Sequence, residues 1–260
     1  MRRAVLAGAL ALAACHSGPQ APASESVGTI SAEPVTLTAA DGAKVYGVAT
    51  RPEKARALIL LFHQAESGKD EYATIAPRLA QAGYASLRID QRAGGAMFGG
   101  NDTAKALGVA TGHVATGAEY MAAKQDLEAA LAWAGGQKLP VILWGSSYSA
   151  SLALVVASEH PDAVKAVLAF SPGEYFDDRS VVARAAGKIT MPLFVTSAQD
   201  GKEIDAARAV IDAAPAKDKT QFVPKTGGIH GSSTLLRPRN PEGAEPAWKA
   251  VMAFLGRVSG

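Results

Sequence analysis

Cysteine is almost absent from this 260-residue chain, in which Cys15 is the only one. No intramolecular disulfide can form, and no other thiol is available for a metal site or a nucleophile. A charge excess is also missing, since 26 basic residues stand against 24 acidic ones. Without a basic surface the sequence lacks the electrostatic signature of nucleic-acid binding. We therefore expect no nucleic acid, metal or cofactor among the partners of this protein.

The apolar run from Ala4 to Ala14 has only eleven residues, too few to span a bilayer as a helix. It follows two basic residues, Arg2 and Arg3, and ends in small residues before Cys15. A basic start, a short apolar stretch and a small-residue end are typical of a signal peptide. Residues 1–14 are therefore predicted to be removed from the mature protein.

The segment Leu12-Ala13-Ala14-Cys15 resembles the lipobox of bacterial lipoproteins. The resemblance implies that Cys15 is acylated before cleavage, and that the protein is lipid-anchored in the cell envelope, facing the periplasm or the cell exterior. The alternative is an ordinary secretory signal that is cleaved after Ala14 or a later alanine. Loss of residues 1–14 leaves equal numbers of basic and acidic side chains, so membrane attachment would depend on the lipid.

Residues 15–33 are rich in Ser, Ala, Pro and Gly and follow no helical or alternating pattern. Such a composition predicts a flexible tether. Residues 34–260 are long enough for one domain with a sizeable core. This domain should open with a hairpin, because Val35–Thr38 and Val45–Ala49 flank the strong turn signal Asp41-Gly42.

From Ala57 onward, short apolar runs alternate with helical patterns. Continuous apolar runs of this length are typical of strands buried on both faces. Alternating strands and helices predict an α/β fold with a mostly parallel central sheet and helices on both faces. The predicted strands are Ala57–Phe62, Tyr84–Ile89, Val141–Trp144, Ala163–Phe170, Leu193–Thr196 and Thr220–Val223, and the predicted helices are Ile75–Ala82, Glu119–Trp133, Tyr148–Glu159, Glu203–Ala213 and Pro246–Leu255.

The segment from Trp144 to Ser149 lies between a predicted strand and a predicted helix. This is the context of a nucleophile elbow, a sharp turn that presents a serine hydroxyl. The residues two before and two after the nucleophile must be small, which favours Ser147 with Gly145 and Ser149 as its flanks. Ser146 is excluded by two large flanking residues, and Ser149 itself falls inside the helix.

A serine nucleophile needs a histidine base, and the histidine needs a carboxylate. Of the five histidines, His230 lies in a glycine-rich loop between the last predicted strand and the last helix. Asp200 follows a predicted strand and is the expected acid, with Glu174 as the alternative. Glu203 falls in the next helix and is expected to face away. The expected triad is Ser147, Asp200 and His230.

Two further segments complete a resemblance to the α/β-hydrolase superfamily, nearest to its small dienelactone-hydrolase-like members. Leu60–Ala65 stands where these proteins carry an oxyanion-hole loop, and Ile89–Gly95 resembles their Asp-x-Arg-Gly-x-Gly segment. The resemblance implies that the N–H groups of Ala65 and Tyr148 form the oxyanion hole. True dienelactone hydrolases use a cysteine nucleophile, which this domain lacks.

Only residues 171–190 separate two predicted strands at the usual place of a cap domain, so no large cap is expected. Gln64, Tyr175 and Phe176 are the candidate pocket residues, below a loop at Ala93–Ala118. An open pocket favours small or flexible ester substrates, with peptides and thioesters as alternatives. The fold alone does not establish chemistry, so a non-catalytic envelope binding module is the competing class of function.

Overall fold

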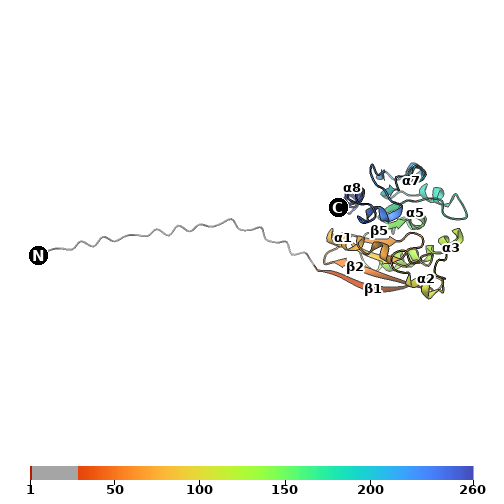
Figure 1. The fold of residues 1–260 in the computed structure, drawn as a ribbon, viewed down its shortest axis with the longest axis horizontal. Helices are drawn as coiled ribbons and strands as arrows, with labels where there is room; N and C mark the ends of the chain where they lie inside the picture. Colours follow the sequence, from red (N-terminus) through yellow and green to blue (C-terminus); the bar gives the residue numbers. More distant parts are fainter. Residues whose placement is uncertain (2–28, 260) are drawn as a thin grey trace.

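The computed structural model describes residues 29–259 together with Met1. Residues 2–14 of the predicted signal peptide and residues 15–28 of the predicted tether, including Cys15, lie outside these described residues. The strands are β1 (Ile30–Thr38), β2 (Lys44–Pro52), β3 (Leu58–Phe62), β4 (Ala85–Ile89), β5 (Val141–Ser146), β6 (Ala166–Phe170), β7 (Leu193–Thr196) and β8 (Lys219–Phe222). They form one sheet in the order β1-β2-β4-β3-β5-β6-β7-β8 (Figure 1).

The sheet is antiparallel only at its N-terminal edge. Strand β2 pairs antiparallel with both β1 and β4, and all later pairings from β3 to β8 are parallel. The helices are η1 (Lys69–Tyr72), α1 (Ile75–Gln81), α2 (Asp102–Ala106), α3 (Gly117–Ala122), α4 (Lys124–Gly135), α5 (Tyr148–Glu159), α6 (Val181–Ala186), α7 (Gly201–Ala213), η2 (Gly231–Leu235) and α8 (Ala244–Val258). The predicted strands are confirmed, although their ends differ by a few residues, and so are the predicted helices that correspond to α1, α5, α7 and α8. The single helix predicted at Glu119–Trp133 is instead divided at Ala123 into α3 and α4. The short η1, α2, α6 and η2 carry too few residues to show a period.

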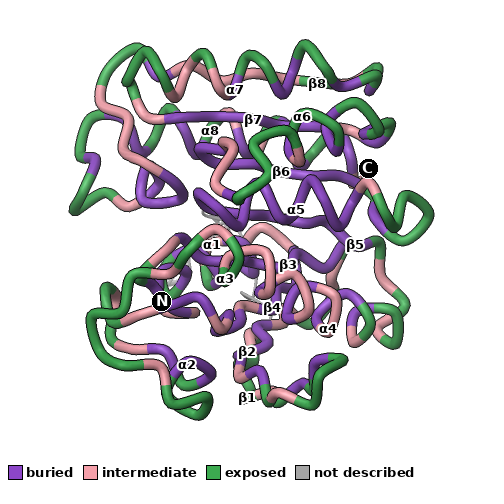
Figure 2. The backbone as a smooth tube through the Cα atoms, turned by 90° about the vertical axis from the view of Figure 1, so that its right-hand side faces the viewer, coloured by how far each residue is buried: buried purple, intermediate pink, exposed green. Residues whose placement is uncertain are grey.

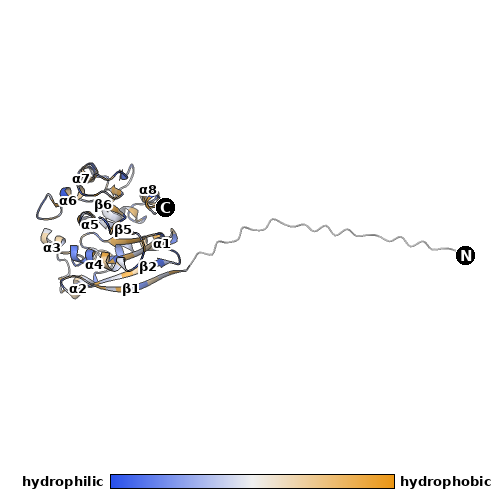
Figure 3. Cartoon of the chain, turned by 180° about the vertical axis from the view of Figure 1, so that it is seen from behind, coloured by the Kyte–Doolittle hydropathy of each residue, from blue (hydrophilic) through white to orange (hydrophobic). Residues whose placement is uncertain are grey.

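Two apolar layers cover the sheet because its central strands are buried on both faces. In β3, Leu58, Leu60 and Phe62 pack on the side of α4, α5, α6 and α7, whereas Ile59 and Leu61 pack on the side of α1 and α8. This alternation follows from the two-residue period of a strand. Burial is most continuous along α5 and the central strands (Figure 2), and orange, hydrophobic segments mark the sheet in Figure 3.

Strand β1 begins earlier than the sequence pattern suggests. Residues 30–33, which were expected in the tether, pair with β2 through Ile30↔Pro52 to Glu33↔Ala49. These residues are mostly exposed, so they show no apolar alternation although their backbone is paired. Pro34 is compatible with this position because β1 is an edge strand.

No large domain is inserted between β6 and β7, since only α6 and its flanking loops occupy residues 171–192 of the described chain. This confirms the expected uncapped fold. Within residues 29–259, none of the helices has the length and apolar character needed to cross a bilayer.

Candidate active site

Ser147 occupies a strained turn between β5 and α5. Its backbone has φ 60° and ψ −126°, a conformation that is uncommon for a residue other than glycine. The Ser147 N–H donates to the Phe170 carbonyl over 2.7 Å, which pins the turn to β6. A side chain at Gly145 would overlap the Ser149 carbonyl, so the small flanks inferred from the sequence are a steric requirement of this turn.

The three neighbouring serines have different partners. The Ser147 Oγ lies 2.8 Å from the Nε2 of His230. By contrast, Ser146 is buried and donates to Glu71, and Ser149 is buried and donates to the His63 carbonyl over 2.5 Å. The structure therefore brings Ser147, and neither neighbour, to the predicted base.

The carboxylate beside His230 belongs to Glu203. Its Oε1 lies 2.7 Å from the His230 Nδ1, and its Oε2 accepts the Ala198 N–H over 2.9 Å. Burial alone would raise the pKa of Glu203, but the hydrogen bonds from His230 and Ala198 lower it to about 2. Glu203 is thus ionised at neutral pH and fixes the ring orientation of His230.

The expectation that Asp200 contacts His230 is wrong. Asp200 is the N-cap of α7 and accepts the N–H groups of Lys202 and Glu203 over 3.0 and 3.3 Å. A glutamate three residues after an N-cap can turn its side chain back toward the cap. The side chain of Glu203 turns back in this way, beyond Asp200, and accepts the Ala198 N–H. Its carboxylate therefore lies near the end of β7 and does not point away from the site along the helix.

The alternative acid, Glu174, is also occupied elsewhere. Its carboxylate accepts the N–H groups of Val182 and Ala183 over 3.1 and 2.8 Å. These donors lie in the first turn of α6, where N–H groups have no intrahelical acceptor. Glu174 therefore serves the start of α6 and does not contact His230.

Gln64 and Ala65 follow β3 beside the elbow. The Gln64 N–H donates to Glu71 over 2.8 Å, so this N–H is not available to a ligand. Its side-chain amide contacts the Ser233 hydroxyl at 3.3 Å and the Met97 sulfur at 3.7 Å. The side chain of Gln64 thus lies between the His230 loop and the loop at residues 93–100.

The two aromatic candidates for the pocket differ in burial. Phe176 is 1% exposed and packs in the core, so its assignment to the pocket wall is corrected. Tyr175 is partly exposed, and its hydroxyl donates to the Ser171 carbonyl over 3.0 Å. Burial raises the pKa of Tyr175, and a hydrogen bond with Ser147 offsets part of this rise. Tyr175 therefore borders the reactive serine.

Only part of the loop at residues 93–118 lies close to the candidate site. Met97 contacts Gln64, and beyond the loop Tyr120 of α3 stacks on Tyr148, with ring centroids 4.4 Å apart. The outer part of the loop encloses a hollow of about 130 Å³. Its lining contains Leu107, Val109 and Ala115 but not Ser147.

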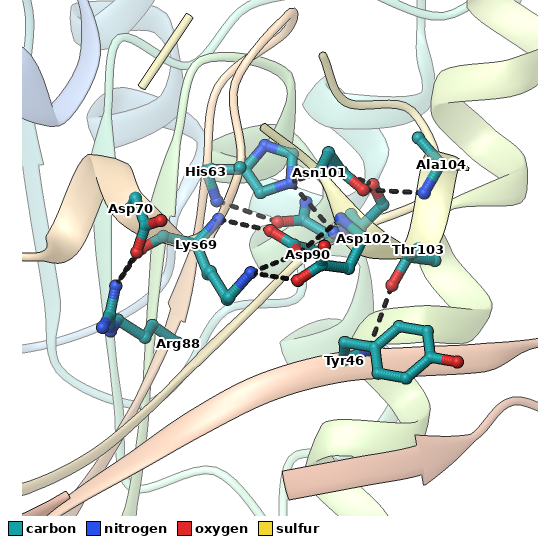
Figure 4. A network of polar contacts seen from close by, with 12 residues as sticks. Tyr46, His63, Lys69, Asp70, Arg88, Asp90, Asn101, Asp102, Thr103 and Ala104 are labelled. Carbon is teal, nitrogen blue, oxygen red and sulfur yellow. Dashed lines mark hydrogen bonds and ion pairs between the residues drawn. The ribbon is translucent and has the colours of Figure 1, made fainter. Parts of the chain in front are cut away.

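A buried polar network anchors the loops below the site (Figure 4). Asp90 accepts the backbone N–H and the ammonium group of Lys69 over 2.6 and 2.8 Å, and it also accepts the Asp102 N–H over 2.8 Å. His63 is fully buried, with Nδ1 2.7 Å from the Gln64 carbonyl and Nε2 accepting the Gln91 N–H over 2.9 Å. Asp90 and His63 therefore hold η1 and α2 against the ends of β3 and β4.

One surface group could resemble a metal site by composition. Ligand atoms of Glu128, Glu159 and His160 lie within 4.8 Å of one another. The ammonium group of Lys124 contacts both carboxylates, at 3.2 and 2.5 Å. Because Lys124 already supplies the positive charge, this group does not indicate a metal centre.

Comparisons with known proteins agree with this fold. Residues 53–194, more than half of the chain, match the family model described as "Serine aminopeptidase, S33". Comparison with curated proteins gives no match.

Solved structures with a similar fold include three esterases or dienelactone hydrolases. The Pyrococcus furiosus esterase Pf2001 is 18% identical with a TM-score of 0.65, over 89% of this chain and 94% of that one. The dienelactone hydrolase from Anabaena variabilis is 17% identical with a TM-score of 0.68, over 88% and 98%. Brefeldin A esterase, a bacterial homologue of human hormone-sensitive lipase, is 15% identical with a TM-score of 0.67, over 93% and 80%. The fold and the family match together show that the chain belongs to the S33 serine aminopeptidase family of the α/β-hydrolase superfamily.

Proposed function

We propose that this protein is a serine hydrolase that cleaves carboxylic esters of small or flexible molecules. The observation that carries the proposal is the continuous hydrogen-bonded chain from the Ser147 Oγ through His230 to Glu203, with distances of 2.8 and 2.7 Å. A serine hydroxyl becomes an effective nucleophile when a histidine accepts its proton and a carboxylate stabilises the charged ring. Ser147 is the nucleophile, His230 the base and Glu203 the acid of this triad.

The reaction proceeds in two halves. The Ser147 Oγ attacks the ester carbonyl carbon while its proton passes to the Nε2 of His230, and the carbonyl oxygen becomes an oxyanion. The tetrahedral intermediate collapses as the alkoxide leaves with the proton from His230, giving an acyl-serine and the free alcohol. Water then loses a proton to His230 and attacks the acyl-serine, which releases the carboxylic acid and restores Ser147.

The N–H groups of Ala65 and Tyr148 hold the oxyanion in this proposal. Tyr148 is the first residue of α5, where an N–H has no intrahelical acceptor and the helix dipole favours negative charge. Ala65 follows Gln64, whose own N–H is occupied by Glu71. Such preorganised donors stabilise charge that develops in the transition state.

An ester substrate is favoured over a peptide because an ester has the better leaving group, and the absence of a cap domain between β6 and β7 favours small or flexible molecules. The esterases among the similar folds support the same choice. A non-catalytic binding module remains the competing proposal, since a fold does not fix chemistry.

Labelling with a fluorophosphonate, followed by a panel of short- and medium-chain esters, tests the proposal. We expect stoichiometric labelling of the wild-type protein and hydrolysis of at least one ester class. If the protein hydrolyses only peptides or thioesters, the proposed triad would stand but the proposed ester substrate class would be wrong. A protein that takes no label and cleaves nothing in the panel would favour the binding module.

We also propose, from the sequence Leu12-Ala13-Ala14-Cys15, that the mature protein is acylated at Cys15 and held at a membrane of the cell envelope by this lipid. Because paired acyl chains anchor a protein stably, the wild type should fractionate with membranes and Cys15→Ser should be released from them. Intact mass of the membrane-extracted protein checks the modification. An unmodified mature chain, or a Cys15→Ser variant still in the membrane fraction, would contradict the proposal.

A further inference from the structure

A buried carboxylate that the proposed reaction does not use lies beside Ser147. Glu71, in η1, is 1% exposed. Its hydrogen-bond partners are the Gln64 N–H and the hydroxyls of Ser146 and Ser67, all of them uncharged. A buried carboxylate without an ion pair costs folding free energy. This cost indicates that the position of Glu71 serves a function.

The contacts of Glu71 join segments that are far apart in the sequence. Its Oε2 accepts the Gln64 N–H over 2.8 Å, and its Oε1 accepts the Ser146 hydroxyl over 2.7 Å. The Ser146 Oγ in turn accepts the Ser232 N–H over 2.8 Å. One carboxylate thus links the loop after β3, the elbow and the segment that follows the base.

Each of these partners is a close chain neighbour of a proposed catalytic group. Gln64 directly precedes the oxyanion donor Ala65, Ser146 directly precedes the nucleophile, and Ser232 lies two residues after the base. A small shift of any of these backbones would change the distances on which the reaction depends. The link through Glu71 therefore controls geometry without touching a substrate.

Glu71 cannot easily turn away from this position. The neighbouring Tyr72 hydroxyl donates to the Phe62 carbonyl over 2.7 Å and contacts the Ser232 hydroxyl at 3.2 Å. At the other end of η1, Lys69 is bound by the buried Asp90 (Figure 4). Both ends of the short helix are fixed, so its carboxylate is held against the elbow.

We propose that Glu71 is a positioning residue. Its ionised carboxylate keeps the oxyanion donor, the nucleophile and the base at the distances that the reaction needs, and it adds a negative charge near His230. The inference rests on the proposed function, because it assigns Glu71 a role in the same reaction. A protonated Glu71 would present an O–H where an acceptor is needed, and the link to Gln64 or to Ser146 would weaken.

The charge state of Glu71 then becomes part of the activity profile. Burial raises its pKa to about 7, although the hydrogen bonds from Gln64, Ser146 and Ser67 and the nearby His230 lower it. The other titratable groups that face it are the buried phenols of Tyr72 and Tyr148. The carboxylate is therefore ionised above pH 7 and loses its charge below, close to the range near pH ~6.5 in which imidazoles ordinarily titrate.

Glu71→Gln tests the proposal because glutamine has the same shape but no charge. We expect kcat/KM for a cleaved ester at pH 8 to fall by about tenfold to a hundredfold, as for a slight misplacement of reacting groups. In the wild type, the slope of log kcat/KM against pH should exceed one on the acid side, because two protonations remove activity. In Glu71→Gln this slope should fall to one, because only the base remains to titrate.

Thermal unfolding separates this role from a merely structural one. Because burial raises the pKa of Glu71 above its ordinary 4.5, its contribution to stability is present at low pH and lost as pH rises through 7. At pH 8, Glu71→Gln should therefore unfold at a Tm no lower than that of the wild type. The matched control is Asp126→Asn, since Asp126 is equally buried but is paired with Arg92. In this control the slope of log kcat/KM against pH should stay above one on the acid side, because the Asp126 carboxylate binds Arg92 and none of the groups that Glu71 links.

Ser146→Ala provides a second variant, should Glu71→Gln fail to fold. It breaks the links to Glu71 and to the Ser232 N–H, so kcat/KM should again fall by about tenfold or more. The proposal would be overturned if a folded variant, Glu71→Gln or Ser146→Ala, kept the wild-type kcat/KM. It would also be overturned if Glu71→Gln kept the wild-type slope of log kcat/KM against pH on the acid side. Either result would leave the proposed hydrolase function standing. A wild-type protein without label or ester hydrolysis would overturn both.

Discussion

Ser147→Ala is expected to abolish fluorophosphonate labelling and to lower kcat/KM for esters by roughly four to six orders of magnitude. The change removes the oxygen that lies 2.8 Å from the His230 Nε2. The oxyanion donors and the pocket remain, so a small residual rate above that of water should persist. Mass spectrometry of the labelled protein and steady-state kinetics measure the two effects.

The neighbouring serine supplies the control for this substitution. Ser146→Ala should still take the label, although more slowly, because the Ser146 hydroxyl is buried against Glu71 and does not contact His230. Ser147→Ala should also keep the Tm close to that of the wild type, since only one hydroxyl is lost. Labelling that survives in Ser147→Ala but disappears in Ser146→Ala would place the nucleophile at Ser146.

Glu203→Gln is expected to lower kcat/KM by about three to four orders of magnitude. A glutamine can turn its NH₂ group toward the His230 Nδ1, which favours the tautomer that cannot accept the serine proton. It also removes the negative charge that stabilises the imidazolium. Because the pKa of Glu203 is lowered to about 2, the wild-type carboxylate remains charged throughout the neutral and mildly acidic range.

Asp200→Asn is the matched control, because Asp200 caps the helix that carries Glu203. Asparagine caps helices about as well as aspartate, so this variant should keep kcat/KM and Tm close to the wild-type values. Asp200→Ala should lose about 1 kcal/mol of stability with the cap. If Asp200→Asn loses more activity than Glu203→Gln, the acid assigned from the geometry is wrong.

The fold was predictable from the sequence because its central strands are buried on both faces. The run Leu193–Thr196 is apolar up to Val195, and its bounds agree with the observed β7 to the residue. The start of β1 was not predictable in the same way, since residues 30–33 are mostly exposed and show no apolar alternation. Their pairing with β2 satisfies the hydrogen-bonding groups of the backbone. It requires no particular order of apolar and polar side chains, so the sequence shows no strand pattern there.

The candidate site was predictable where steric rules act locally. The small flanks required by a strained turn selected Ser147, and the structure places this residue against His230. The acid was missed because helical spacing alone gives the wrong direction for a first-turn side chain. The sequence did carry the needed signal, since Asp200 and Glu203 have the spacing of a cap and a back-turned glutamate. Glu71 had no such signal, because only the folded chain brings it to Ser146.

The direction of strand β1 has a consequence for how substrates reach the serine. Strand β1 starts at Ile30 opposite Pro52, near the amino ends of β3 and β4, whereas Ser147 follows the carboxyl end of β5. An anchor upstream of Ile30 would therefore hold the molecule by the end of the sheet opposite its reactive group. Because the predicted tether is flexible, such an anchor would leave Ser147 able to face the aqueous side, where a dissolved ester could reach it.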